Sequence, residues 1–245
     1  RVALARALVS SDNLIVLDEP ITNLDAKLRE EMAYEIRNLQ ARTGVTVLYI
    51  THDQETAMTL ADRMVIMDKK GSIHQIGTPE EVWTAPTDKF VFEFLGVSNF
   101  IPVRLEQGKL IIRGEGDVQE GDLPPALRSG NLEGGEKISE IEDLMLAIRP
   151  MDIILKPKAE PGKFTGTVER VTYLGNQFDY IVALGEHKLR VQQESYSAFS
   201  QGIPEEGSSC GLDLSTSVFY RTSDSRRLSF SSAASGQVNR KETNL

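Results

Sequence analysis

The 245-residue sequence predicts an α/β fold in its first part and an all-β fold in its second. Two short apolar runs, at 14–17 and 45–50, are followed by polar residues and separated by a helical pattern. Such runs are typical of parallel strands buried on both faces of an α/β sheet. After residue 96 the helical periodicity stops, and short β-like runs separated by Gly and Pro begin. Many short strands without helices predict a small barrel.

The elements of the first part follow from periodicity and from capping residues. Asp25 can cap a helix whose apolar residues recur every three or four positions, and Gly44 stands where a left-handed C-terminal cap belongs. Lys69-Lys70-Gly71 predicts the turn of a hairpin. The other expected elements are helices at 2–8, 54–61, 79–83 and 88–95 and strands at 14–17, 45–50, 63–67 and 72–76.

The clearest strands of the second part form a pair. Every second residue of 178–184 is apolar, and the alternation returns at Leu189 and Val191 after a Gly-Glu turn. This pattern predicts a hairpin with one face in water. Further β-like runs lie at 101–105, 110–113, 144–148 and 153–155.

Composition excludes several classes of protein. The net charge of −9 argues against a nucleic-acid surface, and no apolar run of 18 residues occurs that could cross a membrane. Cys210 is the only cysteine, which rules out an internal disulfide and suits a reducing cytoplasm. We interpret it as a small, semi-buried core residue rather than a reactive thiol.

Polar side chains that could bind a ligand or take part in a reaction follow both predicted parallel strands. Asp18 and Glu19 end the first strand, and His52 comes directly after the second. Ligands gather at the carboxyl ends of such strands, and a buried carboxylate is costly unless it is paired or binds a cation. We therefore expect these three residues at one edge of the sheet. A plain strand-ending turn is the alternative for Asp18-Glu19-Pro20, and a structural histidine is the alternative for His52.

In their order and spacing, these motifs resemble the nucleotide-binding subunit of an ABC transporter. Residues 14–19 match its Walker B strand and catalytic glutamate, Asn23-Leu24-Asp25 matches the D-loop, and His52 matches the switch histidine. The chain contains no G-x-x-x-x-G-K-[ST] motif, Gly-rich signature or Q-loop, all of which precede this region in the family. We therefore expect the carboxyl-terminal part of a longer subunit, inactive alone.

The second part resembles the OB-like TOBE domains of maltose- and polyamine-type importer ATPases. Residues 167–175 with Tyr180, and Ala147-Ile148-Arg149-Pro150 with Asp152, carry this likeness. The expected organisation is the C-terminal part of an ABC ATPase domain at 1–95, a TOBE/OB-like β domain at 96–221 and a disordered tail at 222–245. The tail is expected to be disordered because it is rich in polar residues.

The resemblance implies ATP and Mg²⁺ as cofactors and assigns a role to each site residue. Asp18 would hold Mg²⁺ through water, and Glu19 would polarise the attacking water. His52 would sense the γ-phosphate, and Asp25 would contribute to nucleotide binding by facing a second copy of the subunit. Helix capping alone is the alternative for Asp25.

The implied function is the powering of an ABC importer, with a polyamine-type cargo favoured by Tyr173-Leu174-Gly175 and Tyr180. The expected partners are a second ATPase subunit and transmembrane permease subunits, with no nucleic acid. The expected location is the cytoplasmic face of the membrane, as a peripheral protein. The alternative is a non-catalytic fragment that acts only as a dimerisation or regulatory binding module.

Overall fold

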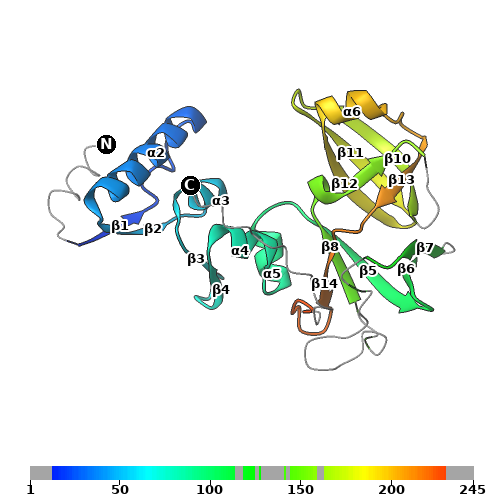
Figure 1. The fold of residues 1–245 in the computed structure, drawn as a ribbon, viewed down its shortest axis with the longest axis horizontal. Helices are drawn as coiled ribbons and strands as arrows, with labels where there is room; N and C mark the ends of the chain where they lie inside the picture. Colours follow the sequence, from blue (N-terminus) through cyan, green and yellow to red (C-terminus); the bar gives the residue numbers. More distant parts are fainter. Residues whose placement is uncertain are drawn as a thin grey trace, which may run out of the picture. The chain divides into compact units, whose positions relative to one another are not determined.

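The computed structural model describes residues 13–113, 118–124, 127, 141, 144–158 and 163–229. The predicted helix at 2–8 and residues 230–245 of the predicted tail lie outside these ranges. The chain forms two compact units that divide after Thr87 (Figure 1). The helix predicted at 88–95 therefore belongs to the second unit.

The first unit is built around two parallel strands joined by a helix. Strand β1 (Leu14–Asp18) pairs with β2 (Thr46–Ile50) in parallel, and α2 (Ala26–Thr43) connects them. The Asp25 carboxylate accepts a hydrogen bond from the Leu28 N–H, and Gly44 has a φ of 68°. Both predicted caps of α2 are confirmed.

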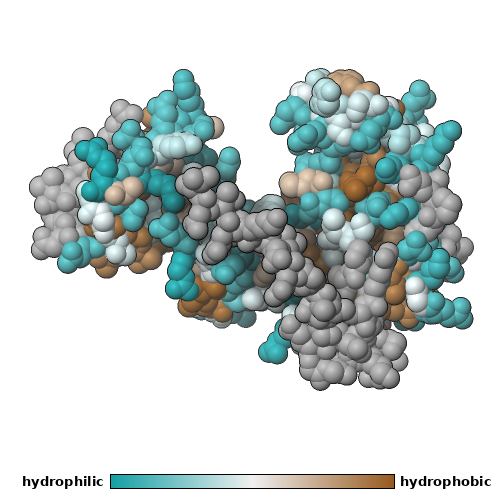
Figure 2. All heavy atoms as spheres, in the orientation of Figure 1, coloured by the Kyte–Doolittle hydropathy of each residue, from teal (hydrophilic) through white to brown (hydrophobic). Residues whose placement is uncertain are grey.

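The prediction that the first strand is buried on both faces was wrong for the part of the chain that the structure describes. Ile15 and Leu17 are buried against α2, whereas Leu14 and Val16 are 54% and 55% exposed. No described element covers their face, because α2 packs on the opposite one. Figure 2 shows apolar side chains at the surface of this unit.

The rest of the first unit is a short helix, a hairpin and a second short helix. The hairpin confirms the prediction, and its turn is fixed by Asp68, whose carboxylate accepts hydrogen bonds from two turn N–H groups. Thr78 and Glu81 form a capping box at the start of the last helix. The elements are α3 (Gln54–Leu60), β3 (Met64–Met67), β4 (Ile73–Gly77) and α4 (Pro79–Thr84).

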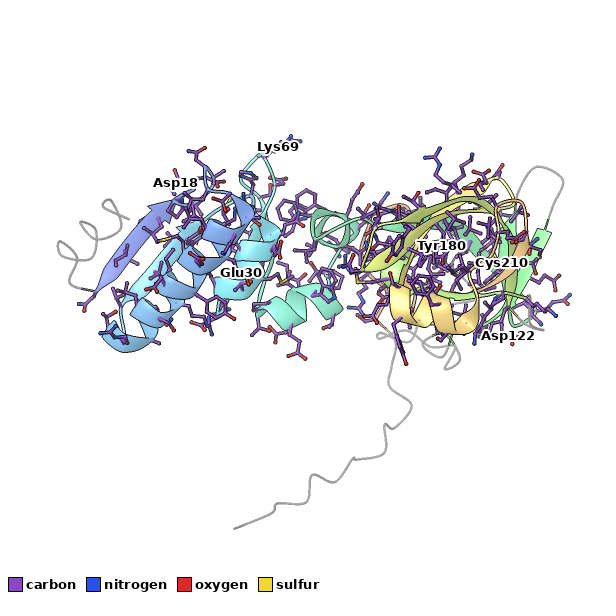
Figure 3. All side chains as sticks on the ribbon, turned by 90° about the horizontal axis from the view of Figure 1, so that it is seen from above. Asp18, Glu30, Lys69, Asp122, Tyr180 and Cys210 are labelled. Atoms are coloured by element: carbon purple, nitrogen blue, oxygen red, sulfur yellow. The ribbon has the colours of Figure 1, made fainter. Side chains whose placement is uncertain are left out.

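In its described residues, the second unit contains two five-stranded antiparallel sheets together with short helices, the first of which is α5 (Lys89–Phe94). One sheet has the order β14-β8-β5-β6-β7 and the other β12-β11-β10-β13-β9. Buried residues from both sheets share one core, and Figure 3 shows Tyr180 and Cys210 inside it. Apart from α5, a 3-10 turn at Pro150–Asp152 and a second short helix described below, the described elements of this unit are strands, which agrees with the prediction of many short strands.

The strands of the first sheet are β5 (Asn99–Glu106), β6 (Lys109–Arg113), β7 (Val118–Asp122), β8 (Leu144–Ile148) and β14 (Val218–Arg221). Those of the second sheet are β9 (Ile154–Lys156), β10 (Phe164–Tyr173), β11 (Gln177–Leu184), β12 (His187–Glu194) and β13 (Ser209–Asp213). Strands β11 and β12 form the predicted hairpin, in which alternate residues of β11 are buried. The short helix α6 (Ser195–Gln201) was not predicted.

The prediction of a disordered tail was wrong for residues 222–229. Leu228 is buried, and its N–H donates to the carbonyl oxygen of Phe219. The carbonyl oxygen of Ser225 accepts a hydrogen bond from the N–H of Lys89, at the start of α5. The segment is ordered because one apolar side chain enters the core and main-chain groups find partners.

Candidate functional site

The candidate site lies where the parallel strands β1 and β2 end. Asp18 lies opposite Ile50 in the register, so the residues that follow the two strands meet at one edge. The N–H of Glu19 donates to the carbonyl oxygen of Ile50 over 2.9 Å. Glu19 has a φ of 46°, a left-handed conformation that is uncommon outside glycine. The backbone of Glu19 is thus tied to the loop that carries His52.

The Glu19 carboxylate accepts hydrogen bonds from both loops that leave the sheet edge. Its Oε1 lies 2.6 Å from Nδ1 of His52 and 3.0 Å from the His52 backbone nitrogen. Its Oε2 accepts from the hydroxyl of Thr22 and, over 3.3 Å, from that of Thr51. The structure therefore brings Glu19 and His52 together, as expected, while their catalytic roles stay predictions.

These contacts determine the charge of Glu19 and the tautomer of His52. The hydrogen bond from Thr22, followed by that from His52, lowers the pKa of Glu19 from its ordinary value of 4.5 to about 2. Glu19 is therefore a carboxylate at neutral pH and can only accept hydrogen bonds. Nδ1 of His52 must carry the proton that it shares with Glu19, which leaves Nε2 available for another contact.

The other two predicted residues lie apart from this contact. Asp18 is exposed on the uncovered face of the sheet, at the end of β1 (Figure 3). Asp25 caps α2 and takes no part in the described contacts of Glu19. Its capping role is confirmed, whereas its proposed role toward a second copy stays a prediction.

The protein supplies few ligands for Mg²⁺ at this site. Within the described ranges, no cluster of three or more His, Cys, Asp or Glu side chains is placed to hold a metal ion. Mg²⁺ commonly binds through one or two carboxylates, keeps several waters and takes further ligands from phosphates. The lone exposed carboxylate of Asp18 fits that mode and does not fit an all-protein cage.

Sequence reasoning missed the residues that support the site. Arg29 pairs with Asp53, with Nη1 3.2 Å from Oδ2, and donates from Nη2 to the carbonyl oxygen of Leu24. Asp53 in turn caps α3 through the N–H and hydroxyl of Thr56. Desolvation acts to raise the pKa of Asp53, but these hydrogen bonds and the Arg29 charge lower it overall. An acid before a helical pattern could have revealed Asp53 as a cap, whereas nothing local pointed to Arg29.

Thr22 and Thr51 gave weaker signals. In the sequence, Thr51 only follows the second apolar run, and Thr22 only precedes Asn23-Leu24-Asp25. Their contacts with Glu19 depend on the left-handed backbone of Glu19 and on the pairing of two strands, which no local pattern encodes.

A family model for the TOBE domain matches residues 146–219, within the second unit. The chain is 35% identical over 215 residues to a spermidine/putrescine import ATP-binding protein, PotA, of Pseudomonas fluorescens, covering 86% of this chain and 55% of that protein. It is 38% identical over 225 residues to an Fe(3+) ions import ATP-binding protein, FbpC, of Brucella melitensis, covering 91% and 57%.

A third relative is a sulfate/thiosulfate import ATP-binding protein, CysA 2, of Chromobacterium violaceum, 40% identical over 177 residues and covering 71% of this chain and 44% of that protein. The chain thus spans about half the length of the curated relatives it matches. Among the residues that the structure describes, no helix is both long and apolar enough to span a bilayer. By these matches, the chain belongs to the family of ABC-importer ATP-binding subunits and carries a TOBE domain in its second unit.

Proposed function

We propose that this chain is part of an ATP-hydrolysing subunit that powers an ABC importer. This proposal rests on the Glu19 carboxylate, which lies at the carboxyl ends of two parallel strands and is hydrogen-bonded by residues of the loops that follow β1 and β2. Named relatives are ATP-binding import proteins, which makes a purely non-catalytic binding module the less favoured alternative.

In this proposal each residue has one task. Glu19 orients the attacking water and accepts its proton. His52, whose exposed ring can turn away from Glu19, would place a ring nitrogen against the γ-phosphate of ATP. Asp18 would hold Mg²⁺ through water, and the bound ion would neutralise charge on the phosphates. Asp25 would meet a second copy of the subunit.

The pKa of Glu19 bears on how it would work. A carboxylate with a pKa of about 2 is always charged at neutral pH but accepts a proton poorly. Once a water has replaced one of the described partners and the others keep the pKa low, orientation of that water is therefore the main contribution of Glu19. Loss of a hydrogen bond to the carboxylate would increase its basicity.

The proposed setting is peripheral, at the cytoplasmic face of the membrane, with permease subunits and a second ATPase subunit as partners. The relatives name polyamines, Fe(3+) and sulfate or thiosulfate. Among these we favour a polyamine, on the Tyr173-Leu174-Gly175 motif. Uptake of iron or sulfate by the reconstituted importer, with no uptake of putrescine or spermidine, would reject that choice and leave the ATPase proposal intact.

The first prediction tests Glu19 itself. Glu19→Gln keeps the size of the side chain but removes its charge and its ability to take a proton. In the complete subunit to which we propose that this chain belongs, we expect ATP binding to persist and turnover to fall by about 10²-fold or more. Glu30→Gln, which changes an exposed acid on α2, is the matched control and should leave turnover unchanged. Full activity of Glu19→Gln would reject the proposed function.

A further inference from the structure

The four hydrogen bonds to Glu19 leave its carboxylate no free acceptor position. A carboxylate has about four lone-pair sites, two on each oxygen. Oε1 is occupied by the backbone N–H and the ring of His52, and Oε2 by the hydroxyls of Thr22 and Thr51. A water that is to donate to Glu19 must displace one of these four groups.

The two oxygens differ in how firmly their partners are held. The His52 side chain is 74% exposed, so its ring can turn about its own bonds. Thr51 is fixed further, because its hydroxyl also accepts from the N–H of Asp53 over 3.0 Å. Thr22 follows Glu19 by three residues in the same tight turn. The ring of His52 is therefore the group that can leave with the least disturbance.

We infer that Oε2 of Glu19 is a fixed anchor and Oε1 its working oxygen, and that Thr22 is a positioning residue for the reaction. This inference rests on the proposed function. In the described arrangement all four acceptor positions of the Glu19 carboxylate are filled by protein groups. When the His52 ring turns toward a phosphate, it opens one acceptor position on Oε1, while the Thr22 and Thr51 hydroxyls keep the carboxylate from rotating with it.

Thr22 offers a clean test, because Glu19 is the only partner of its hydroxyl among the contacts described. Thr51 does not, because its replacement would also disturb the start of α3. Thr22→Val removes the hydroxyl at nearly constant volume, and Thr22→Ser keeps it. Thr59→Val is the matched control, since the Thr59 hydroxyl only donates to a carbonyl oxygen within α3.

The assay measures ATP turnover by the complete subunit to which we propose that this chain belongs. We expect Thr22→Val to lower kcat by about tenfold or more with KM for ATP within about twofold, on the strength of a hydrogen bond to a charged group. Thr22→Ser and Thr59→Val should stay within about twofold of the unchanged protein. In a Glu19→Gln background, Thr22→Val should have no further effect, because there is no carboxylate to position.

Several outcomes would overturn the inference. These are an unchanged kcat in Thr22→Val, an equal loss in Thr22→Ser, or an additive loss in the Glu19→Gln background. If Glu19→Gln is inactive and Thr22→Val is fully active, only the inference fails, whereas a fully active Glu19→Gln rejects the proposed function.

A second measurement does not depend on the folding of any variant. Nitrogen NMR of the 245-residue chain at pH 8, without nucleotide, should show His52 protonated at Nδ1. An Nε2-protonated ring would contradict the described contact and the inference with it.

Discussion

The thiol of Cys210 is fully buried and lies 3.6 Å from the carbonyl oxygen of Gly166. Burial raises the pKa of this thiol to about 11, so at pH 8 only about one molecule in a thousand carries a thiolate. Because the thiolate is the reactive form, we expect iodoacetamide to leave the native chain unmodified at pH 8. In denaturant the same reagent should modify it, as mass spectrometry can show. Rapid modification of the native chain would contradict the described burial.

At the same scale, the chemical identity of the site could be predicted but its support could not. Glu19 and His52 were identified because each follows an apolar strand, and parallel strands bring such positions together. The contact of Thr22 depends on the left-handed backbone of Glu19. Arg29 contributes through a 3.2 Å ion pair with Asp53, which lies on a separate element. Such contacts arise from the three-dimensional course of the chain rather than from a local motif.

Among the elements, β5 is joined to the other sheet by one buried side chain. The Asn99 Oδ1 accepts from the Arg190 N–H, and its Nδ2 donates to the Arg190 carbonyl oxygen, each over 2.8 Å. β12 is the edge strand of its sheet, so these two main-chain groups depend on Asn99.

Asn99→Ala would leave both Arg190 groups without these partners inside the protein. We expect a loss of about 2–4 kcal/mol in the free energy of unfolding, measured by urea denaturation. Asn176→Ala, at an exposed position, is the control and should change the free energy of unfolding by less than about 0.5 kcal/mol. Equal stabilities of the two variants would show that Asn99 does not support β12.

The elements also show which local signals are sufficient. The caps of α2 were predicted because Asp25 and Gly44 each solve a local problem of unpaired backbone groups. Helix α6 was missed because it is short, has no side-chain cap, and exposes Tyr196 and Phe199. The prediction that β1 is buried on both faces was wrong, because a short apolar run does not reveal how many faces of a sheet are covered.

At the scale of the whole chain, the sequence pattern changes from helical periodicity to short β-like runs near residue 96. The units divide a little earlier, after Thr87, because α5 packs with the β-rich part. Phe92 of α5 lies against Tyr220 and beneath the guanidinium of Arg149, all within the second unit. A helical pattern alone could not show which unit its apolar face joins.

The last prediction concerns the independence of the second unit. Its two sheets share one core, and the segment 222–229 adds Leu228 to that core and a hydrogen bond between Ser225 and α5. A polypeptide of residues 88–229 should therefore unfold in a single cooperative transition. A shorter polypeptide of residues 88–221 should be less stable by about 2–4 kcal/mol, because it loses a buried leucine and its backbone pairing. Urea denaturation followed by circular dichroism measures both. Equal midpoints and slopes would show that residues 222–229 contribute nothing to the stability of this fold.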